Sequence, residues 1–155
     1  MNSKSLDRID RKILRTMQDD GRLTNLQLAE RISLSPTATA ERLKRLTRDG
    51  YILGYQAMLS PEKLDLGMLV YVEVKLDRTT PDVFDEFATA IRKADEVMEC
   101  HMVAGGFDYL IKARVKGMDT YRSFLSDVIL SLPGIRETHT YAVMEDIHNT
   151  DKLPV

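Results

Sequence analysis

Apolar residues in the first fifty positions recur every three or four residues, which is the spacing of amphipathic helices. A first helix is predicted within residues 6–21, LDRIDRKILRTMQDDG, with Gly21 as its stop. A second helix is predicted from about residue 25 to residue 32. A third is expected to begin at Pro36, because Ser35 is a good N-cap and proline suits a first helical position, where its missing N–H needs no partner.

These three helices, with a short turn between the second and the third, predict a helix-turn-helix. In the third helix Leu43 and Leu46 are expected to face inward, with Thr39 one turn earlier. The residues then placed on or beside the exposed face are Thr37, Ala38, Glu41, Lys44, Arg45 and Arg48. After Asp49-Gly50, the segment YILGYQA is expected to form a short strand, a small wing-like appendage.

Beyond residue 60 the period of the pattern changes to two, as in LVYVEVKLD, residues 69–77, which predicts a strand with valines on one face. The segments that follow are a helix over 81–94, strands over 96–104 and 107–115, a helix over 118–132 and a strand over 137–146. This βαββαβ order predicts a ferredoxin-like antiparallel sheet with both helices on one face.

The predicted fold class is therefore α+β. The expected divisions are a winged-helix-like helix-turn-helix domain over residues 1–53, a linker strand and hinge over 54–67, and a ferredoxin-like domain over 68–155. The sheet face away from the helices would carry a mixture of charged and apolar residues, too mixed for a core: Glu73, Lys75, Lys112, Arg114, His139, Tyr141 and Val143. Such a face suits a partner, most simply a second copy of the chain.

Charge is divided unevenly along the chain of 155 residues, whose formal net charge is −2. The first 60 residues hold eleven Lys and Arg against seven Asp and Glu, a net charge of +4, so the remainder carries −6. A basic helix-turn-helix suits double-stranded DNA, because small side chains at the start of the third helix can enter the major groove while later cations reach phosphates. The candidate DNA-binding residues are Ser35, Thr37, Ala38, Glu41, Arg42, Lys44, Arg45 and Arg48. The alternative is a solvated basic face on a structural three-helix module.

Other classes of function find little support in the sequence. No apolar run approaches the roughly 18 residues of a membrane span, and the opening residues lack an apolar signal segment, so we expect no membrane association and a cytoplasmic location. Cys100 is the only cysteine and cannot form an internal disulfide. Cys100 and His101 are neighbours on a predicted strand and point to opposite faces, so we expect no metal site. No catalytic grouping is predicted.

The motif AGGFDY, between the second and third strands of the predicted sheet, has two interpretations. Gly105 and Gly106 permit the positive φ angles of a tight two-residue hairpin turn, which accounts for both glycines. The same turn leaves backbone N–H groups uncovered beside the carboxylate of Asp108. Donors and an anion close together are what the carboxylate and ammonium of an α-amino acid need.

Nine segments of the chain resemble the Lrp/AsnC family of bacterial and archaeal transcription regulators, closest to its leucine-responsive subgroup. They are LDRIDRKIL, DGRLTNLQLAERISLSPT, ERLKRL, GYILGYQAMLSPEKL, PDVFDEF, ECHMVAGGFDYLIKARV, MDTYRSFL, LPGIRETHTY and AVMED. The ATA of residues 38–40 departs from the subgroup's pattern, which leaves the operator sequence open.

The resemblance implies a regulator that binds DNA, responds to an amino acid effector such as leucine, needs no other cofactor, and forms a homodimer that assembles to a higher even oligomer, an octamer. It places the effector in the second domain near the AGGFDY loop, between dimers. The candidate effector-binding residues are Val103, Gly105, Gly106, Asp108, Tyr109, Thr138, Thr140 and Tyr141. Two alternatives remain at this point: an architectural protein that bends DNA without an effector, and a small-molecule enzyme on a ferredoxin-like scaffold.

Overall fold

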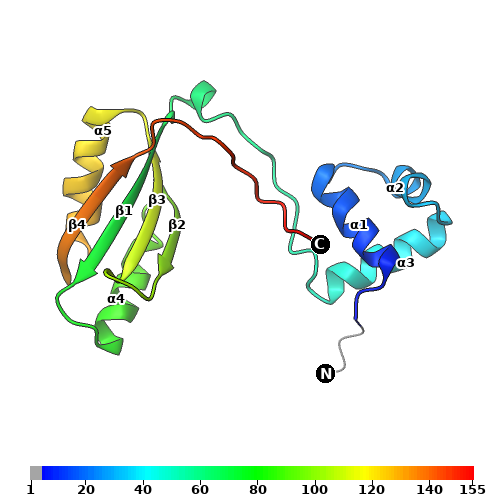
Figure 1. Cartoon of the computed structure of the whole chain (residues 1–155), viewed down its shortest axis with the longest axis horizontal. Coiled ribbons are helices and arrows are strands. Elements are labelled where there is room, and N and C mark those ends of the chain that lie inside the picture. The colour runs from blue at the N-terminus through cyan, green and yellow to red at the C-terminus, as the bar shows by residue number, and fades with distance from the viewer. Residues whose placement is uncertain (1–4) are drawn as a thin grey trace. The chain divides into compact units, whose positions relative to one another are not determined.

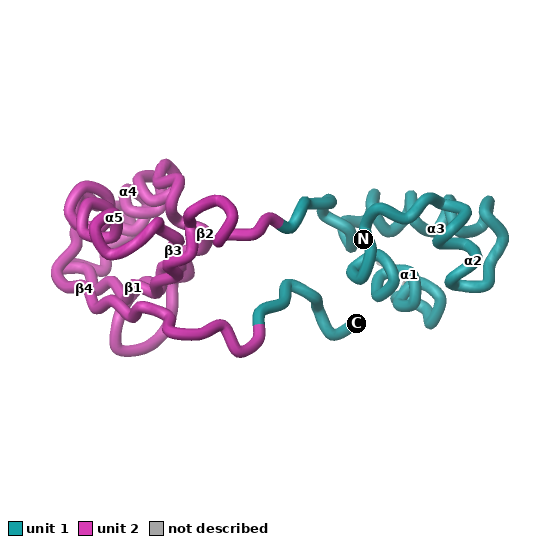
Figure 2. The backbone as a smooth tube through the Cα atoms, turned by 90° about the horizontal axis from the view of Figure 1, so that it is seen from above, with its two compact units in different colours: residues 1–58, 149–155 teal, residues 59–148 magenta. Residues whose placement is uncertain are grey.

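A computed structural model describes residues 5–155 of the chain and divides it into two compact units (Figures 1 and 2). Unit 1 runs through Met58 and also includes Asn149–Val155, whereas unit 2 is Leu59–His148. The sequence pattern assigns residues 149–155 to the second domain. In the structure they pack with the first unit, so the chain passes between the units twice.

Unit 1 contains the three predicted helices, α1 (Arg8–Asp19), α2 (Asn25–Ile32) and α3 (Pro36–Arg48). Both α1 and α2 begin with a capping box, in which the N-cap side chain and the third helical side chain each accept a backbone N–H. The N-cap of α3 is Ser35, with Pro36 following at the first helical position as predicted. Local sequence therefore accounts for all three helix starts.

Apolar side chains from all three helices form the core of unit 1. The fully or nearly fully buried members are Ile13, Leu14, Met17, Leu28, Ile32 and Leu46. Thr39 is also buried, and its hydroxyl donates to the carbonyl oxygen of Ser35 at 2.9 Å, so burial leaves no unpaired polar group there. The inward side of α3 is thus the one that the spacing of apolar residues predicts.

The predicted strand YILGYQA is wrong for this structure, in which residues 52–60 have no assigned secondary structure. The helix stop itself is as expected, because Gly50 takes φ +78° and the N–H of Tyr51 donates to the carbonyl of Leu46 at 2.9 Å. A strand needs a paired neighbour for its backbone hydrogen bonds, and among the described residues no strand pairs with this segment. The segment is extended and exposes Leu53 and Met58.

Unit 2 is a four-stranded antiparallel sheet with the strand order β2-β3-β1-β4. Its elements are β1 (Met68–Leu76), α4 (Pro81–Ile91), β2 (Val97–Met102), β3 (Tyr109–Val115), α5 (Met118–Ser123) and β4 (Ile135–Ala142), preceded by a short 3-10 helix, Glu62–Leu64. Both helices lie on the same side of the sheet, as Figure 2 shows. This is the ferredoxin-like arrangement that the βαββαβ order predicts.

The core of unit 2 lies between the sheet and these helices. Val70, Val72, Val74 and Leu76 of β1 are buried on the helix-facing side, which confirms the alternation in the sequence. The predicted helix over residues 118–132 is not a single α-helix.

Beyond α5 the chain continues as a π-helical turn, Phe124–Val128, and then a 3-10 turn, Ile129–Ser131. Phe124 and Ile129 are both buried, and they are five residues apart. An α-helix brings residues three or four apart to the same face, whereas a π-turn brings residues five apart together. The wider turn therefore keeps both side chains in the core.

Candidate DNA-binding and ligand-binding sites

The turn between α2 and α3 is held by backbone and side-chain hydrogen bonds. Ser33 ends α2 in the left-handed region, with φ 59° and ψ 52°, which lets the N–H of Leu34 donate to the carbonyl of Ala29 at 3.0 Å. The side chain of Asn25 donates to the carbonyl oxygen of Pro36 at 2.8 Å, which ties the start of α2 to the start of α3. The two helices of the motif are thus fixed at both the turn and their N-terminal ends.

The outward face of α3 carries the side chains that the sequence predicts there. Thr37, Glu41, Lys44 and Arg48 are exposed, and Ala38 is half-buried. Arg48 pairs with its chain neighbour Asp49, at 2.9 Å, and the Arg48 side chain is 71% exposed. Exposed pairs of this kind contribute little stability, so Arg48 can exchange its partner for another anion. Ser35 serves as the N-cap, since its side chain accepts from the N–H of Ala38.

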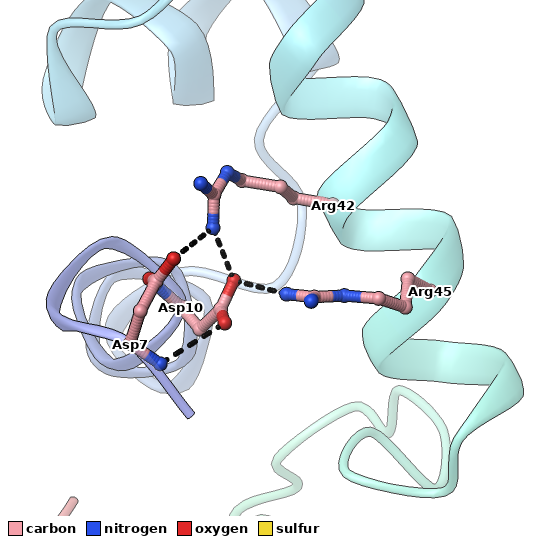
Figure 3. Close-up of polar contacts among 4 residues, drawn as sticks. All are labelled: Asp7, Asp10, Arg42 and Arg45. Carbon is pink, nitrogen blue, oxygen red and sulfur yellow. Dashed lines mark hydrogen bonds and ion pairs between the residues drawn. The ribbon is translucent and has the colours of Figure 1, made fainter. Parts of the chain in front are cut away.

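Arg42 and Arg45 are engaged inside unit 1, with carboxylates at the start of α1 (Figure 3). Arg42 Nη1 lies 2.7 Å from Asp7 Oδ2 and 2.8 Å from Asp10 Oδ1. Arg45 Nη2 lies 2.5 Å from the same Asp10 oxygen. The Asp10 side chain is 2% exposed, whereas the two arginines are about one-third exposed at 31% and 29%. The pairs therefore fasten α1 to α3.

The same contacts shift the pKa values of Asp7 and Arg42. The backbone N–H of Asp10 and then the Arg42 guanidinium lower the pKa of Asp7. Hydrogen bonds to Asp7 and Asp10 raise the pKa of Arg42. Sequence reasoning assigns Arg42 and Arg45 to DNA and misses both aspartates. A signal for Asp10 exists, because it shares a helical face with Ile13, Leu14 and Met17 and so has to be buried.

The AGGFDY loop differs from the predicted two-residue hairpin. Strand pairing ends at Met102 and Tyr109, and the N–H of Val103 donates to the carbonyl of Asp108 at 2.9 Å, so the loop is longer. Neither Gly105 nor Gly106 has a positive φ, and a Cβ at either would meet no atom within 4 Å. Backbone strain and close packing within this chain therefore do not explain the two glycines. Their backbone is open to a molecule from outside.

Asp108 joins this loop to the end of β1. Its backbone N–H donates to the carbonyl of Val74 at 2.9 Å, and its Oδ2 accepts the N–H of Leu76 at 2.7 Å. A carboxylate has about four acceptor sites, so this bond leaves capacity for a further donor. Asp108 thus has a structural contact that sequence reasoning does not predict, beside the ammonium contact that it does predict.

The structure does not gather all the predicted effector residues in one place within a single chain. Tyr109 is 5% exposed and its ring stacks on Phe87, with centroids 4.2 Å apart, so Tyr109 belongs to the core. Thr140 faces the helices, where its hydroxyl is hydrogen-bonded to that of Tyr121.

The remaining strand residues are divided between the sheet faces. Tyr141 is 55% exposed on the opposite face, directly across from Tyr71 of β1. Thr138 lies opposite Val74, at the end of β1 that contacts Asp108. Gly105, Gly106 and Asp108 share one loop, with Val103 at its base, and Thr138 is the predicted residue of β4 nearest to that end.

The sheet face away from the helices carries pairs of polar side chains. Glu99 Oε1 lies 2.7 Å from Lys112 Nζ on the neighbouring strand, and this contact, followed by that with His101, lowers the pKa of Glu99. Glu137 and His139 lie 3.1 Å apart on β4. The single cysteine, Cys100, is half-buried, and burial raises the pKa of its thiol to about 11. It is therefore a poor nucleophile at neutral pH.

The part of the chain that the structure describes has neither a cluster of metal-binding side chains nor a helix that could span a membrane. Among residues 5–155, no three His, Cys, Asp or Glu side chains are grouped so that they could hold a metal ion. Within that same part of the chain, no helix combines the length and apolar character that crossing a membrane requires.

Comparison with known proteins matches both units to families. Residues 6–52 match the winged helix-turn-helix DNA-binding family, and residues 69–153 match the Lrp/AsnC ligand binding domain. The chain belongs to the Lrp/AsnC family. It is 50% identical to the leucine-responsive regulatory protein of Escherichia coli strain K12, over 98% of this chain and 93% of that protein.

Solved structures of Lrp/AsnC relatives share the whole fold. A transcriptional regulator from Neisseria meningitidis, solved in complex with L-Met, has a TM-score of 0.92 and 38% identity, covering 97% of each chain. An AsnC family regulator from Agrobacterium tumefaciens has a TM-score of 0.92 and 31% identity, covering 96% of this chain and 97% of its own. The present chain is thus a DNA-binding transcription regulator with a ligand-binding domain, as the resemblance predicts.

Proposed function

We propose that this Lrp/AsnC regulator binds operator DNA through the exposed face of α3, and that a small amino acid bound by unit 2 changes that binding. The main support is that the cations of α3 fall into two groups, one exposed and one bound to α1. Lys44 and Arg48 are exposed and, among the described residues, form no ion pair with another helix, while Arg42 and Arg45 hold α3 to α1. A rigidly held helix that presents small residues and exposed cations suits a major groove.

Thr37 and Ala38 are proposed to lie near base edges, since their side chains are short and lie in the first turn of α3. Lys44 and Arg48 lie farther along the helix and are proposed to contact phosphates. Glu41 lies between them and would disfavour close approach of a phosphate, which restricts the docking angle. Arg42 and Arg45 contribute to DNA binding chiefly by fixing α3.

The effector is proposed to be an amino acid with an apolar side chain, such as leucine or methionine. Support comes from the L-Met complex of the structurally similar Neisseria meningitidis regulator and from the open backbone of Gly105 and Gly106. Their N–H groups suit the effector carboxylate, and the remaining capacity of Asp108 suits its ammonium. An unpaired charged group in such a pocket costs at least about 1–3 kcal/mol, so both ends of the ligand need a partner.

The pocket is proposed to be completed by a second copy of the chain. The candidate residues lie on both faces of the sheet, and one chain leaves the loop open to solvent. The face that carries Tyr71, Tyr141 and the polar pairs around Glu99 and Glu137 is proposed as a homodimer surface, with assembly to a higher even oligomer, an octamer in the family's pattern. We place the protein in the cytoplasm and infer that it acts by binding rather than by catalysis.

Titration calorimetry with the full chain tests the ligand half of the proposal. L-Leucine and L-methionine are each added to the protein, with their D-enantiomers as matched controls. The L-forms are expected to bind and the D-forms to bind at least about tenfold more weakly, since exchange of the ammonium or side-chain direction leaves a charged group unpaired. The absence of binding by both L-leucine and L-methionine would contradict an effector of this kind and leave the DNA-binding half of the proposal alone.

A further inference from the structure

The end of the described chain lies along α1, within unit 1. Leu153 makes a two-point contact with Gln18: its N–H donates to Gln18 Oε1 at 2.6 Å, and its carbonyl accepts from Gln18 Nε2 at 3.1 Å. Lys152 Nζ lies 2.8 Å from Asp19 Oδ1, and Arg15 Nε donates to the carbonyl of Val155. Three side chains of α1 therefore contact three residues of one short segment.

The three receptor side chains form one stripe on α1. Arg15, Gln18 and Asp19 are spaced i, i+3 and i+4, which brings them to the same side of a helix. Ile13 and Met17, by contrast, face the core. The stripe is thus distinct from the packing face of α1 and is available to a peptide.

The segment that occupies this stripe has matching chemistry. Gln18 pairs with both backbone groups of Leu153, as a neighbouring strand would, so it selects an extended backbone rather than a side chain. Pro154 restricts Leu153 to extended conformations and so lowers the entropic cost of docking. Lys152 offers a positive charge to Asp19, and Val155 packs against the hydrophobic core of unit 1.

The electrostatics agree with this pairing. The hydrogen bond from Lys152, followed by its charge, lowers the pKa of Asp19. The pair is exposed, with 55% of the Lys152 side chain and 64% of the Asp19 side chain accessible, so it gives specificity more than stability. The stability of the docked segment comes chiefly from the backbone contacts of Gln18 and the packing of Val155.

We propose that Arg15, Gln18 and Asp19 form a docking surface whose occupant is the chain's own segment Lys152–Val155. Docking gives the three helices of unit 1 a second, non-covalent link to unit 2, in addition to the covalent one that follows Met58. The second connection begins after β4 and ends on α1, the helix whose Asp10 holds Arg42 and Arg45 of α3. The strap so formed attaches to the helix that anchors α3, so it restrains the helix-turn-helix independently of the first connection.

Hydrogen exchange of the full-length protein, followed by mass spectrometry, tests the docked state. The amides of residues 150–155 are expected to exchange about tenfold more slowly in the wild type than in Gln18→Ala, because local opening controls exchange of a hydrogen-bonded amide. Glu30→Ala is the control, since Glu30 is an exposed residue of α2 and so lies outside the stripe on α1. Equal exchange in the wild type and Gln18→Ala, with α1 itself still protected in both, would overturn the proposal.

Charge reversal separates a specific dock from a general effect on folding. Asp19→Lys and Lys152→Asp are each expected to speed exchange of the segment by about two- to fivefold, and the double variant is expected to restore slow exchange. If the double variant exchanges as fast as either single variant, the contact is not specific and the proposed dock is wrong.

Hydrogen exchange over a series of protein dilutions shows whether the docked segment belongs to the same chain or to another copy. Protection by the chain's own segment is independent of protein concentration, whereas protection by the segment of another copy falls as the oligomer dissociates. Protection that disappears over a roughly hundredfold dilution across the dissociation range would assign the docked segment to a second copy and overturn the intrachain strap.

Discussion

Asp10 and Arg45 form an ion pair of 2.5 Å between α1 and α3, and the same Asp10 oxygen lies 2.8 Å from Arg42 (Figure 3). Asp10 is buried, and its other oxygen, Oδ2, accepts the N–H of Asp7 in the capping box of α1. One side chain thus starts the first helix and holds the third. Two cations of α3, Arg42 and Arg45, therefore stabilise the fold, whereas Lys44 and Arg48 remain exposed.

Asp10→Ala is expected to lower the free energy of unfolding of the helix-turn-helix by about 2–3 kcal/mol. The change removes a capping-box acceptor and the buried partner of two arginines, although these arginines remain partly hydrated and so retain some of their solvation. Denaturant unfolding followed by circular dichroism measures the change. Glu30→Ala, at an exposed position of α2, is the control and should leave stability within about 0.5 kcal/mol. Equal stability of the two variants would mean that the network does not hold α1 to α3.

Ser33→Gly is expected to raise the free energy of unfolding by up to about 1 kcal/mol. Ser33 has φ 59°, a region that costs a non-glycine residue about 1–2 kcal/mol, and relief of this strain outweighs the extra chain entropy of glycine. Ser33→Ala keeps the same strain and should have stability close to that of the wild type. Thermal melts of the three proteins make the comparison, and a glycine variant that melts below the alanine variant would refute the strain.

Asp108→Asn is expected to weaken binding of L-leucine or L-methionine at least about tenfold while the protein stays folded. Asparagine keeps an oxygen that can accept the N–H of Leu76, but it lacks the charge that an ammonium requires. Asp108→Ala removes both, so it should also lower stability by about 1 kcal/mol. Calorimetry and thermal melts separate these effects. Full affinity in the asparagine variant would place the ammonium elsewhere.

The double variant Lys44→Ala with Arg48→Ala is expected to bind DNA less tightly and with a shallower salt dependence. Removing one cation from a phosphate reduces the slope of log K against log salt by about 0.9, so the largest expected change for two cations is about 1.8. Stability should be nearly unchanged, because both side chains are exposed. Fluorescence anisotropy over a series of salt concentrations measures the slope. A wild-type slope in the double variant would show that these cations do not meet phosphates.

The order of elements is predictable because hydrophobic periodicity alone distinguishes the helices of unit 1 from the strands of unit 2. Val70, Val72 and Val74 lie where alternation puts them, and Ser35 caps α3 as its residue type requires. The division of residues 118–132 into three pieces is not predicted by that periodicity. The spacing of five between the apolar residues Phe124 and Ile129 becomes informative only once both are known to be buried.

Hydrophobic periodicity does not predict contacts between residues that are distant in sequence. The pairing of Asp10 with Arg42 spans 32 residues, and that of Gln18 with Leu153 spans 135. The glycine loop is predicted as a short turn because glycine pairs commonly supply positive φ, but Gly105 and Gly106 do not adopt it. Identification of the family depends instead on many short motifs in a fixed order, which do not require these contacts to be known.

An amino acid bound by unit 2 is proposed to change how α3 binds DNA. Binding isotherms for one genomic fragment, selected by the protein itself, test this most directly at a fixed salt concentration, with and without the amino acid that calorimetry shows to bind. The Kd for DNA is expected to change at least about fivefold, the lower end of typical coupling between two sites, and Asp108→Asn should abolish the change at the same amino acid concentration. Superimposable isotherms for the wild type, at saturating amino acid, would mean that the bound amino acid does not regulate DNA binding.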